Sequence, residues 1–519
     1  MQEKYNNASV YRFSELLFLT IAIALTMTTG ACYPDQDKCT EDGFCENGTS
    51  PFSIKSSIFV PRLKEILRQS VNALSPSTPF YEMDENAVAT LIFESMYTPG
   101  RVYHSMQHVF NITQNCDMRN DPILLLSTLF HDVIYYTVDK SFQESQLEFL
   151  ENVLVFENVE DDGETKEESK IRLKQPLELS SDALKDPLLT MVFRLYDFKP
   201  GTSLPSFGSN EFLSAVIGVR VLSKWLSMPQ LTQIAAAIEA TIPFRPASSD
   251  GKTAMDRLYD RLVTVASNQS EAWLAETIHL SATMANCDLC SFDSSNFDFF
   301  LDSSWSLVPE FRPSLLKEDC PLQEYYDEFL AMEGRTKFLI SAIPNIFQVF
   351  RNVPSESELT VKRARTRANL DLGNDYAQVR RLQLMVLMDF VTILGENPCS
   401  IPGRPFLRLE LPKSVPLSED EDDKLKNLLD KGRHECFPWD PSRCSLGAFL
   451  YDKLGKKGID TAVEVGKKQK SGSSDLLEHL PKDMVAAIAS TLSGVLPNRA
   501  NELLEIVDKL GVSQTQARR

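Results

Sequence analysis

Apolar residues recur every three or four positions through most of the chain, the spacing that places them on one face of an α-helix. The segment 60–74 is an example, with Leu63, Leu67 and Val71 on one face. No alternation of apolar and polar residues extends beyond a few positions before Gly395, so the pattern predicts an all-α protein. Its expected helices span residues 60–74, 86–96, 139–155, 188–198, 210–226, 231–240, 253–265, 270–287, 322–350 and 368–395.

An uncharged apolar run at residues 16–27 stands near the N-terminus, and small residues follow it. Its length fits the core of a signal peptide better than a helix that spans a membrane. We therefore expect residues 1–31 to be a signal peptide or membrane anchor. The protein is then exported, either periplasmic, secreted or membrane-anchored. A buried helix at the start of the globular domain is the alternative interpretation.

Changes in composition divide the rest of the chain. Residues 32–57 are rich in Pro, Asp, Gly, Asn and Ser with little periodicity, and we expect a linker there. The helical pattern fills residues 58–397, which we predict to be one domain. Prolines and an acidic run at 419–423 mark a further boundary. Residues 398–519 are predicted to be a small helical extension without chemistry of its own.

The overall charge limits the partners that the chain can bind. Its formal net charge is −19, which argues against a broad surface for nucleic-acid backbone. A small phosphorylated substrate stays compatible with this charge, because a bound metal ion can reverse the local field. Membrane contact is expected only through the N-terminal segment, and the oligomeric state is left open.

Histidines are concentrated in one stretch of the sequence. Three of the six histidines, His104, His108 and His131, lie within residues 101–136. His104 and His108 are four positions apart, which would place them on one face of a helix. His131 is followed by Asp132, near the end of an apolar segment that starts with the helix-initiating pair Asp-Pro. Imidazoles and a carboxylate brought together by two helices predict a divalent-metal site.

A further ligand is expected from a distant part of the chain. Asp288 ends an apolar predicted helix, where burial of a carboxylate without a partner would be costly. His279 lies nine positions earlier, on the opposite face of that helix, and is therefore left out. Asp288 is the predicted fourth ligand.

These residues carry a resemblance to a known family. The segments R-V-Y-H-S-M-Q-H, F-H-D and N-C-D-L resemble the HD superfamily of metal-dependent phosphohydrolases, over roughly residues 97–288. The resemblance implies an HD-type helical bundle that binds a divalent metal such as Mn, Fe, Co, Ni, Zn or Mg. It also implies roles for individual residues: the metal ligands would be His108, His131, Asp132 and Asp288, and the proton donor to the leaving group would be His104.

The chain departs from the related cyclic-nucleotide phosphodiesterases. Ser105 follows the first histidine, where they carry asparagine, and no second H-D pair occurs. These departures argue against two-metal chemistry. Glu144 lies in a segment that resembles a weakly defined acidic motif of the family, and it is a weaker candidate.

Cationic residues and cysteines add further expectations. Arg101 and Arg245 are candidates for binding substrate phosphate, whereas the basic cluster at 362–367 fits a solvated helix start equally well. The pair Cys287 and Cys290 is interpreted as two buried thiols rather than a zinc or redox motif. The sequence leaves open whether Cys399, Cys436 and Cys444 form a disulfide.

Together these observations predict metal-dependent hydrolysis of a phosphate monoester or diester, such as a nucleotide. A divalent ion would lower the pKa of bound water and neutralise charge on a phosphoryl group. The alternative is a binding or regulatory protein with the same fold and no turnover.

Overall fold

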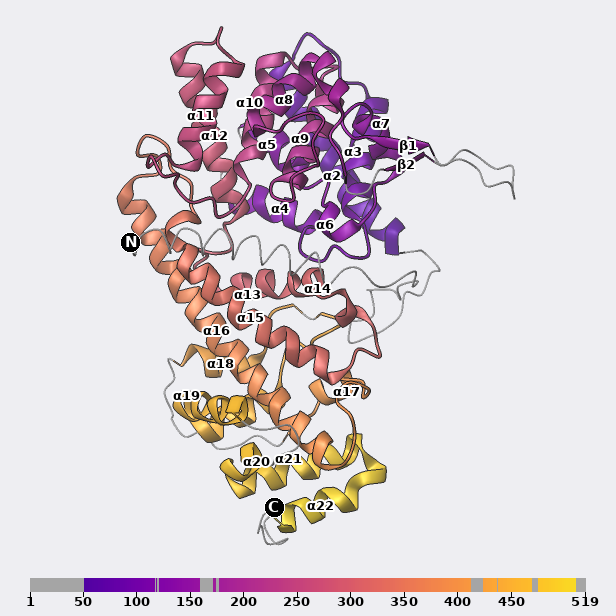
Figure 1. The fold of residues 1–519 in the computed structure, drawn as a ribbon, viewed down its shortest axis with the longest axis vertical. Helices are drawn as coiled ribbons and strands as arrows, with labels where there is room; N and C mark the ends of the chain where they lie inside the picture. The colour runs from indigo at the N-terminus through magenta and orange to yellow at the C-terminus, as the bar shows by residue number, and fades with distance from the viewer. Residues whose placement is uncertain are drawn as a thin grey trace, which may run out of the picture. The chain divides into compact units, whose positions relative to one another are not determined.

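The structure is a computed structural model, and it describes residues 51–116, 118, 121–158, 171–173, 177–411, 423–435, 437–468 and 475–509. The described residues form two compact units. Residues 51–290 and 345–356 make up the first unit, and residues 291–344 and 357–509 make up the second, apart from the gaps. Each unit is built from helices (Figure 1).

The first unit contains most of the predicted chemistry. Its elements are α2 (Pro51–Leu74), α3 (Glu82–Met96), α4 (Met106–Asn115), α5 (Pro122–Phe130), α6 (Tyr136–Asp139), α7 (Glu144–Leu150), β1 (Phe156–Asn158), β2 (Ile171–Leu173), η1 (Ser181–Lys185), α8 (Pro187–Tyr196), α9 (Ser209–Leu222), α10 (Met228–Ala240), α11 (Ala254–Val265) and α12 (Glu271–Asp288).

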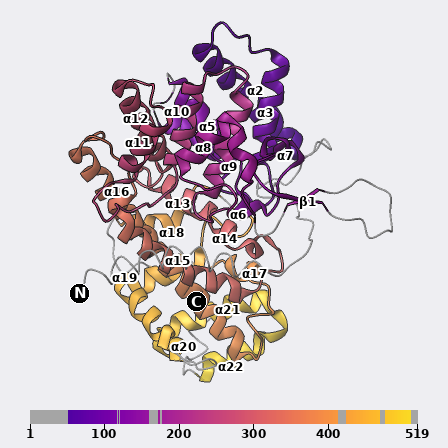
Figure 2. The same cartoon turned by 45° about the horizontal axis from the view of Figure 1, so that its top comes forward.

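Helix α10 forms the centre of this unit. It packs against α5, α8, α9, α11 and α12 (Figure 2). Residues 231–240 of α10 are all buried, and three consecutive alanines among them allow close packing of the neighbouring helices. Gly218 of α9 lies against Phe130, the last residue of α5, where a Cβ would stand 3.2 Å from the Phe130 Cβ. The end of α5, which carries the predicted H-D pair, is therefore held tightly by α9.

Local signals in the sequence explain where α5 begins. The Asp121 carboxylate accepts hydrogen bonds from the backbone N–H groups of Ile123 and Leu124, at 2.9 and 3.0 Å. Pro122 occupies the first helical position, where its missing N–H costs nothing. The predicted start at Asp121-Pro122 is confirmed.

The second unit is also helical. Its elements are α13 (Phe297–Ser306), α14 (Val308–Phe311), η2 (Pro313–Leu316), α15 (Leu322–Ala342), α16 (Glu356–Ile393), α17 (Arg404–Leu407), α18 (Lys424–Lys431), α19 (Ser445–Lys468), α20 (Asp475–His479), α21 (Lys482–Val495), η4 (Pro497–Arg499) and α22 (Ala500–Lys509), and η3 (Ile343–Asn345) lies where the two units meet in sequence.

The predicted all-α fold is confirmed, apart from one small antiparallel hairpin. Strands β1 and β2 pair with Phe156 opposite Leu173. The helix predicted over 139–155 is wrong: α6 ends where Lys140 adopts a left-handed conformation, with φ 61°, and α7 ends at Leu150. The helix predicted over 322–350 ends at Ala342, because Pro344 follows within the 3-10 turn η3.

The division into units differs from the predicted domain over 58–397. Helices α13, α14 and α15 and nearly all of α16 belong to the same unit as the C-terminal helices. The sequence signal at 398 marks a change of composition. It does not mark the point where one hydrophobic core ends and another begins.

The predicted location is corrected by the structure. Among the described residues, every helix is too short or too polar to cross a lipid bilayer. The described residues therefore give the expected exported or membrane-anchored location no support. The apolar run at 16–27 on which that prediction rested lies outside the described residues.

Candidate metal centre

Three helix ends of the first unit bring the predicted ligands to one point. His108 lies in the first turn of α4, His131 directly follows α5, and Asp288 is the last residue of α12. One ligand atom from each of these residues lies within 4.8 Å of the other two. The His108 Nε2 is 3.0 Å from the Asp288 Oδ1, and the His131 Nε2 is 3.4 Å from the same oxygen.

Asp132 adds a second carboxylate to this group. Its Oδ2 lies 2.9 Å from the His131 Nε2 and 3.7 Å from the His108 Nε2. Ligand atoms bound at about 2.0–2.2 Å to one ion lie about 2.8–3.6 Å from each other, so three of the four separations fit a shared cation and the fourth, at 3.7 Å, is slightly longer. Within the described chain, the His131 Nε2 and the Asp132 Oδ2 are buried and make no hydrogen bond of acceptable geometry, although they lie 2.9 Å apart. Buried polar atoms are rarely left in this state, which favours an ion as their common partner.

A hydrogen bond to the backbone fixes the orientation of the His131 ring. Its Nδ1 lies 2.9 Å from the backbone carbonyl oxygen of Thr128, so this nitrogen carries the proton and donates it. The Nε2 is then directed at the two carboxylates. A hydrogen bond of this kind, from the second ring nitrogen to a carbonyl, is typical of histidines that bind metals.

The charged groups of the centre shift one another's pKa values. Burial lowers the pKa of His131, but Asp132 and Asp288 counteract burial and raise it well above its usual value. Burial raises the pKa of Asp288, but the hydrogen bond from His108 and the charge of His131 together lower it to about 2. Burial likewise raises the pKa of Asp132, and the neighbouring histidines lower it below its ordinary value. The two carboxylates thus favour a positive partner, which a proton or a cation can supply.

His104 lies beside the centre but not on the helix of His108. Helix α4 begins at Met106 with Ser105 as its N-cap, so the expected shared helical face is wrong. The His104 ring stacks on Tyr135, with ring centroids 3.9 Å apart, and its centroid lies 5.9 Å from that of His108. His104 and Tyr135 are both partly exposed. His104 therefore lies next to the buried ligands on a side that solvent reaches.

Arg101 is buried and already occupied. Its Nη2 lies 2.6 Å from the Asp139 Oδ2, and its Nη1 donates to the backbone carbonyl of Asp132. Its side chain is 0% exposed. The Arg101 guanidinium thus holds the turn that follows the H-D pair. Because it is buried and paired, it is not positioned to bind a phosphate.

Arg245 is paired as well. Its Nη1 lies 2.5 Å from the Glu239 Oε1, and Arg261 contacts the same carboxylate. Within the described chain, however, the Nε of Arg245 is buried without a hydrogen-bond partner. In the second unit, Lys362 of the basic cluster pairs with Asp293 at 2.8 Å. Glu144 is the exposed first residue of α7.

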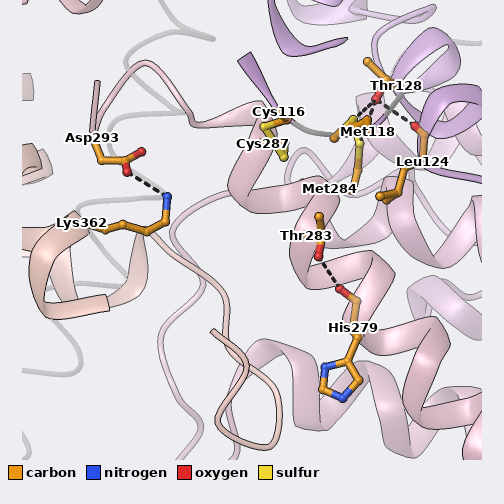
Figure 3. Close-up of a disulfide and its surroundings, with 10 residues drawn as sticks. All are labelled: Cys116, Met118, Leu124, Thr128, His279, Thr283, Met284, Cys287, Asp293 and Lys362. Carbon is orange, nitrogen blue, oxygen red and sulfur yellow. Dashed lines mark hydrogen bonds and ion pairs between the residues drawn. A yellow bond between two sulfur atoms is a disulfide. The ribbon is translucent and has the colours of Figure 1, made fainter. Parts of the chain in front are cut away.

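A disulfide joins two of the ligand-bearing helices. Cys116 and Cys287 are bonded across 171 residues of sequence, with their Cα atoms 5.8 Å apart (Figure 3). The expected pair of thiols at Cys287 and Cys290 is therefore wrong, because Cys287 has another partner. Cys399 and Cys444 are outside any disulfide, and Cys436 lies outside the described residues.

Some contributors to the centre were missed from the sequence. The Thr128 contact uses a backbone carbonyl, which leaves no trace in residue identity. Glu211 is a carboxyl in the first turn of α9, whose other residues are mostly apolar, and this was a usable signal. Burial raises the pKa of Glu211 to about 7, and the charges of Asp132 and Asp288 add to the increase.

The comparisons with known proteins add no relative. A scan against protein-family models found no match for this chain, and the searches of curated proteins and of solved structures also found none. The arguments about function therefore rest on the geometry of the centre.

Proposed function

We propose that this protein is a metal-dependent phosphohydrolase whose first unit is an HD-type helical bundle, and that it acts on a small phosphate ester such as a nucleotide. The single observation that carries the proposal is the convergence of His108, His131, Asp132 and Asp288, in which the four distances from histidine Nε2 to carboxylate oxygen are 2.9–3.7 Å. Two imidazoles and two carboxylates are a donor set that suits a divalent transition metal.

The donor set also balances the charge that a divalent ion brings. Two ionised carboxylates carry two negative charges, and the imidazoles are neutral when they bind a metal. When bound, such an ion supplies a Lewis acid that polarises a phosphoryl oxygen and lowers the pKa of water. The protein itself contributes the arrangement of its ligands, fixed by Thr128 behind His131.

His104 is the residue placed to move a proton. It lies beside the ligands on the partly exposed side, and its stacking on Tyr135 limits the orientations of its ring. A protonated imidazole there would donate to the oxygen of the leaving group. This need is greatest for a poor leaving group such as a sugar alkoxide, and small for an aryl oxide.

Two measurements on the full chain test the proposal. First, hydrolysis of an aryl phosphate is followed with Mn²⁺, Co²⁺ or Ni²⁺ for the wild type, His131→Ala and His279→Ala. We expect metal-dependent turnover that His131→Ala abolishes. His279→Ala serves as the matched control. His279 also lies on α12, but its ring packs against Phe350, with ring centroids 5.4 Å apart, and it is outside the ligand group.

The second measurement separates turnover from binding. His104→Gln should slow hydrolysis of an alkyl phosphate more than that of the aryl phosphate, because only the former needs the proton. A wild type that binds the metal and hydrolyses no phosphate ester would favour the alternative of a binding or regulatory protein. A folded wild type that cannot be loaded with metal would contradict both interpretations.

A further inference from the structure

The disulfide connects two of the segments that supply the ligands. Cys116 is the C-cap residue of α4, the helix that carries His108. Cys287 directly precedes Asp288 at the end of α12. The bond therefore joins the helix of one ligand to the residue beside another, although the two cysteines are 171 residues apart in sequence.

Non-covalent contacts alone hold the other ligands in place. The His131 ring is fixed by the Thr128 carbonyl, and the turn after Asp132 is held by Arg101. Between the side chains of α4 and α12, the ligands themselves make the polar link, His108 Nε2 to Asp288 Oδ1 at 3.0 Å. The covalent bond thus fixes the one ligand pair that comes from the two most distant parts of the sequence.

We propose that the Cys116–Cys287 disulfide is a redox-sensitive clasp of the metal centre, and that its reduction lowers the affinity of the site for a divalent cation. This inference rests on the proposed function, because it concerns the same ligands. Cys116 is partly exposed and Cys287 is 8% exposed, so Cys116 is the more accessible end of the bond.

The reduction step balances with a dithiol as the reductant. A thiolate of the dithiol attacks the Cys116 sulfur, the bond between Cys116 and Cys287 breaks, and the Cys287 sulfur leaves as a thiolate and takes up a proton. The second thiol of the dithiol then attacks the mixed disulfide and releases Cys116. Two electrons and two protons pass to the protein, and the dithiol becomes a cyclic disulfide.

The experiment measures metal affinity of the full chain in three states: oxidised wild type, wild type reduced with a phosphine that is removed before titration, and Cys116→Ser. Mn²⁺ or Co²⁺ alone is the probe. We expect the Kd to be about 10- to 100-fold weaker in the second and third states, the size of effect seen when groups that position metal ligands are lost. Reoxidation should restore the affinity of the wild type only.

A purely structural disulfide predicts a different result. Reduction would then lower the unfolding temperature and leave the Kd unchanged in protein that is still folded by circular dichroism, and this would overturn the clasp. Unfolding of the reduced wild type at the titration temperature would overturn it as well. Cys399→Ser is the matched control, because this exposed cysteine is outside any disulfide and belongs to the second unit.

Failure of the clasp and failure of the proposed function are distinguishable. Equal affinity in all three states rejects the clasp and leaves the metal site intact. Absence of binding by the oxidised wild type rejects the metal site, and the clasp with it.

Discussion

Two buried groups of charged side chains, one in each unit, differ in how their carboxylates are neutralised. In the second unit, the Asp440 carboxylate is fully buried and contacts Arg380 and Arg433, both of which have fully buried side chains. The Trp305 Nε1 also donates to its Oδ2, at 2.9 Å. In the first unit, two carboxylates meet two imidazoles.

This difference separates the two groups by the charge of their partners. Asp440 has permanent cations of the protein on both of its oxygens, so it needs no further partner. Asp132 and Asp288 have only histidines, which carry a positive charge when protonated and none when they bind a metal. The Asp440 carboxylate thus has its countercharges within the protein, although, among the described residues, the Nε and Nη1 atoms of Arg380 and Arg433 are buried without hydrogen-bond partners. Within the described chain, the ion-pair partners of Asp132 and Asp288 are histidines alone.

The largest effect is expected from breaking the buried ion pairs of Asp440 in the second unit. Asp440→Ala leaves Arg380 and Arg433 buried without their carboxylate, and removal of one partner of a buried ion pair costs about 3–5 kcal/mol. Urea unfolding followed by circular dichroism should show this loss in the transition of the second unit. Metal binding by the first unit should stay at the wild-type level.

An exposed ion pair in the same unit is the control. Asp371 pairs with Arg367 at 2.8 Å, and both side chains are at least half exposed, so Asp371→Ala should cost less than about 1 kcal/mol. If the two aspartate variants unfold alike, the buried group does not stabilise the second unit as described.

The sequence predicted which residues meet at the candidate centre better than it predicted their surroundings. His131, Asp132 and Asp288 were found because unusual residue types interrupt apolar helices, and such interruptions are visible without a structure. The disulfide and the pairing of Arg101 with Asp139 could not be found in this way, because they join residues that approach only after folding. His104 was misplaced onto a helix, since spacing alone does not show that α4 starts at Met106.

An intermediate effect is expected from binding of a metal ion at the candidate metal centre of the first unit. A ligand that binds only the folded state stabilises it by about 2.7 kcal/mol at 100 times its Kd. Mn²⁺ or Co²⁺ at that excess should therefore raise the unfolding free energy of the first unit by about this amount. Asp288→Asn keeps the shape of the side chain but removes its charge, and its unfolding should not respond to the metal.

The same titration compares the two units. The second unit should show no metal response, because its buried carboxylate already has two arginine partners. An equal response of both transitions would contradict the contrast drawn between the two groups.

The smallest expected effect is a change in the protonation of a buried carboxyl, without a change in the fold. Burial and the charges of Asp132 and Asp288 together raise the pKa of Glu211 to about 7, against the opposing effect of its own backbone hydrogen bond. In the second unit, burial raises the pKa of Asp302 to about 6, with Arg433 opposing. The contribution of each carboxyl to the free energy of unfolding falls as pH rises from its pKa in the unfolded state to its higher pKa in the folded state. The reason is that the folded state binds the extra proton in that range.

A metal ion should act on only one of these two carboxyls. Neutralisation of Asp132 and Asp288 removes their contribution to Glu211, so its pKa falls below 7 and a fraction of a proton is released near neutral pH. Calorimetric titration of Mn²⁺ or Co²⁺ in buffers of different ionisation enthalpy measures this release. Glu211→Gln should reduce it, whereas Asp302→Asn should leave it unchanged. Equal proton release in the wild type and in Glu211→Gln would show that Glu211 does not sense the charge of the centre.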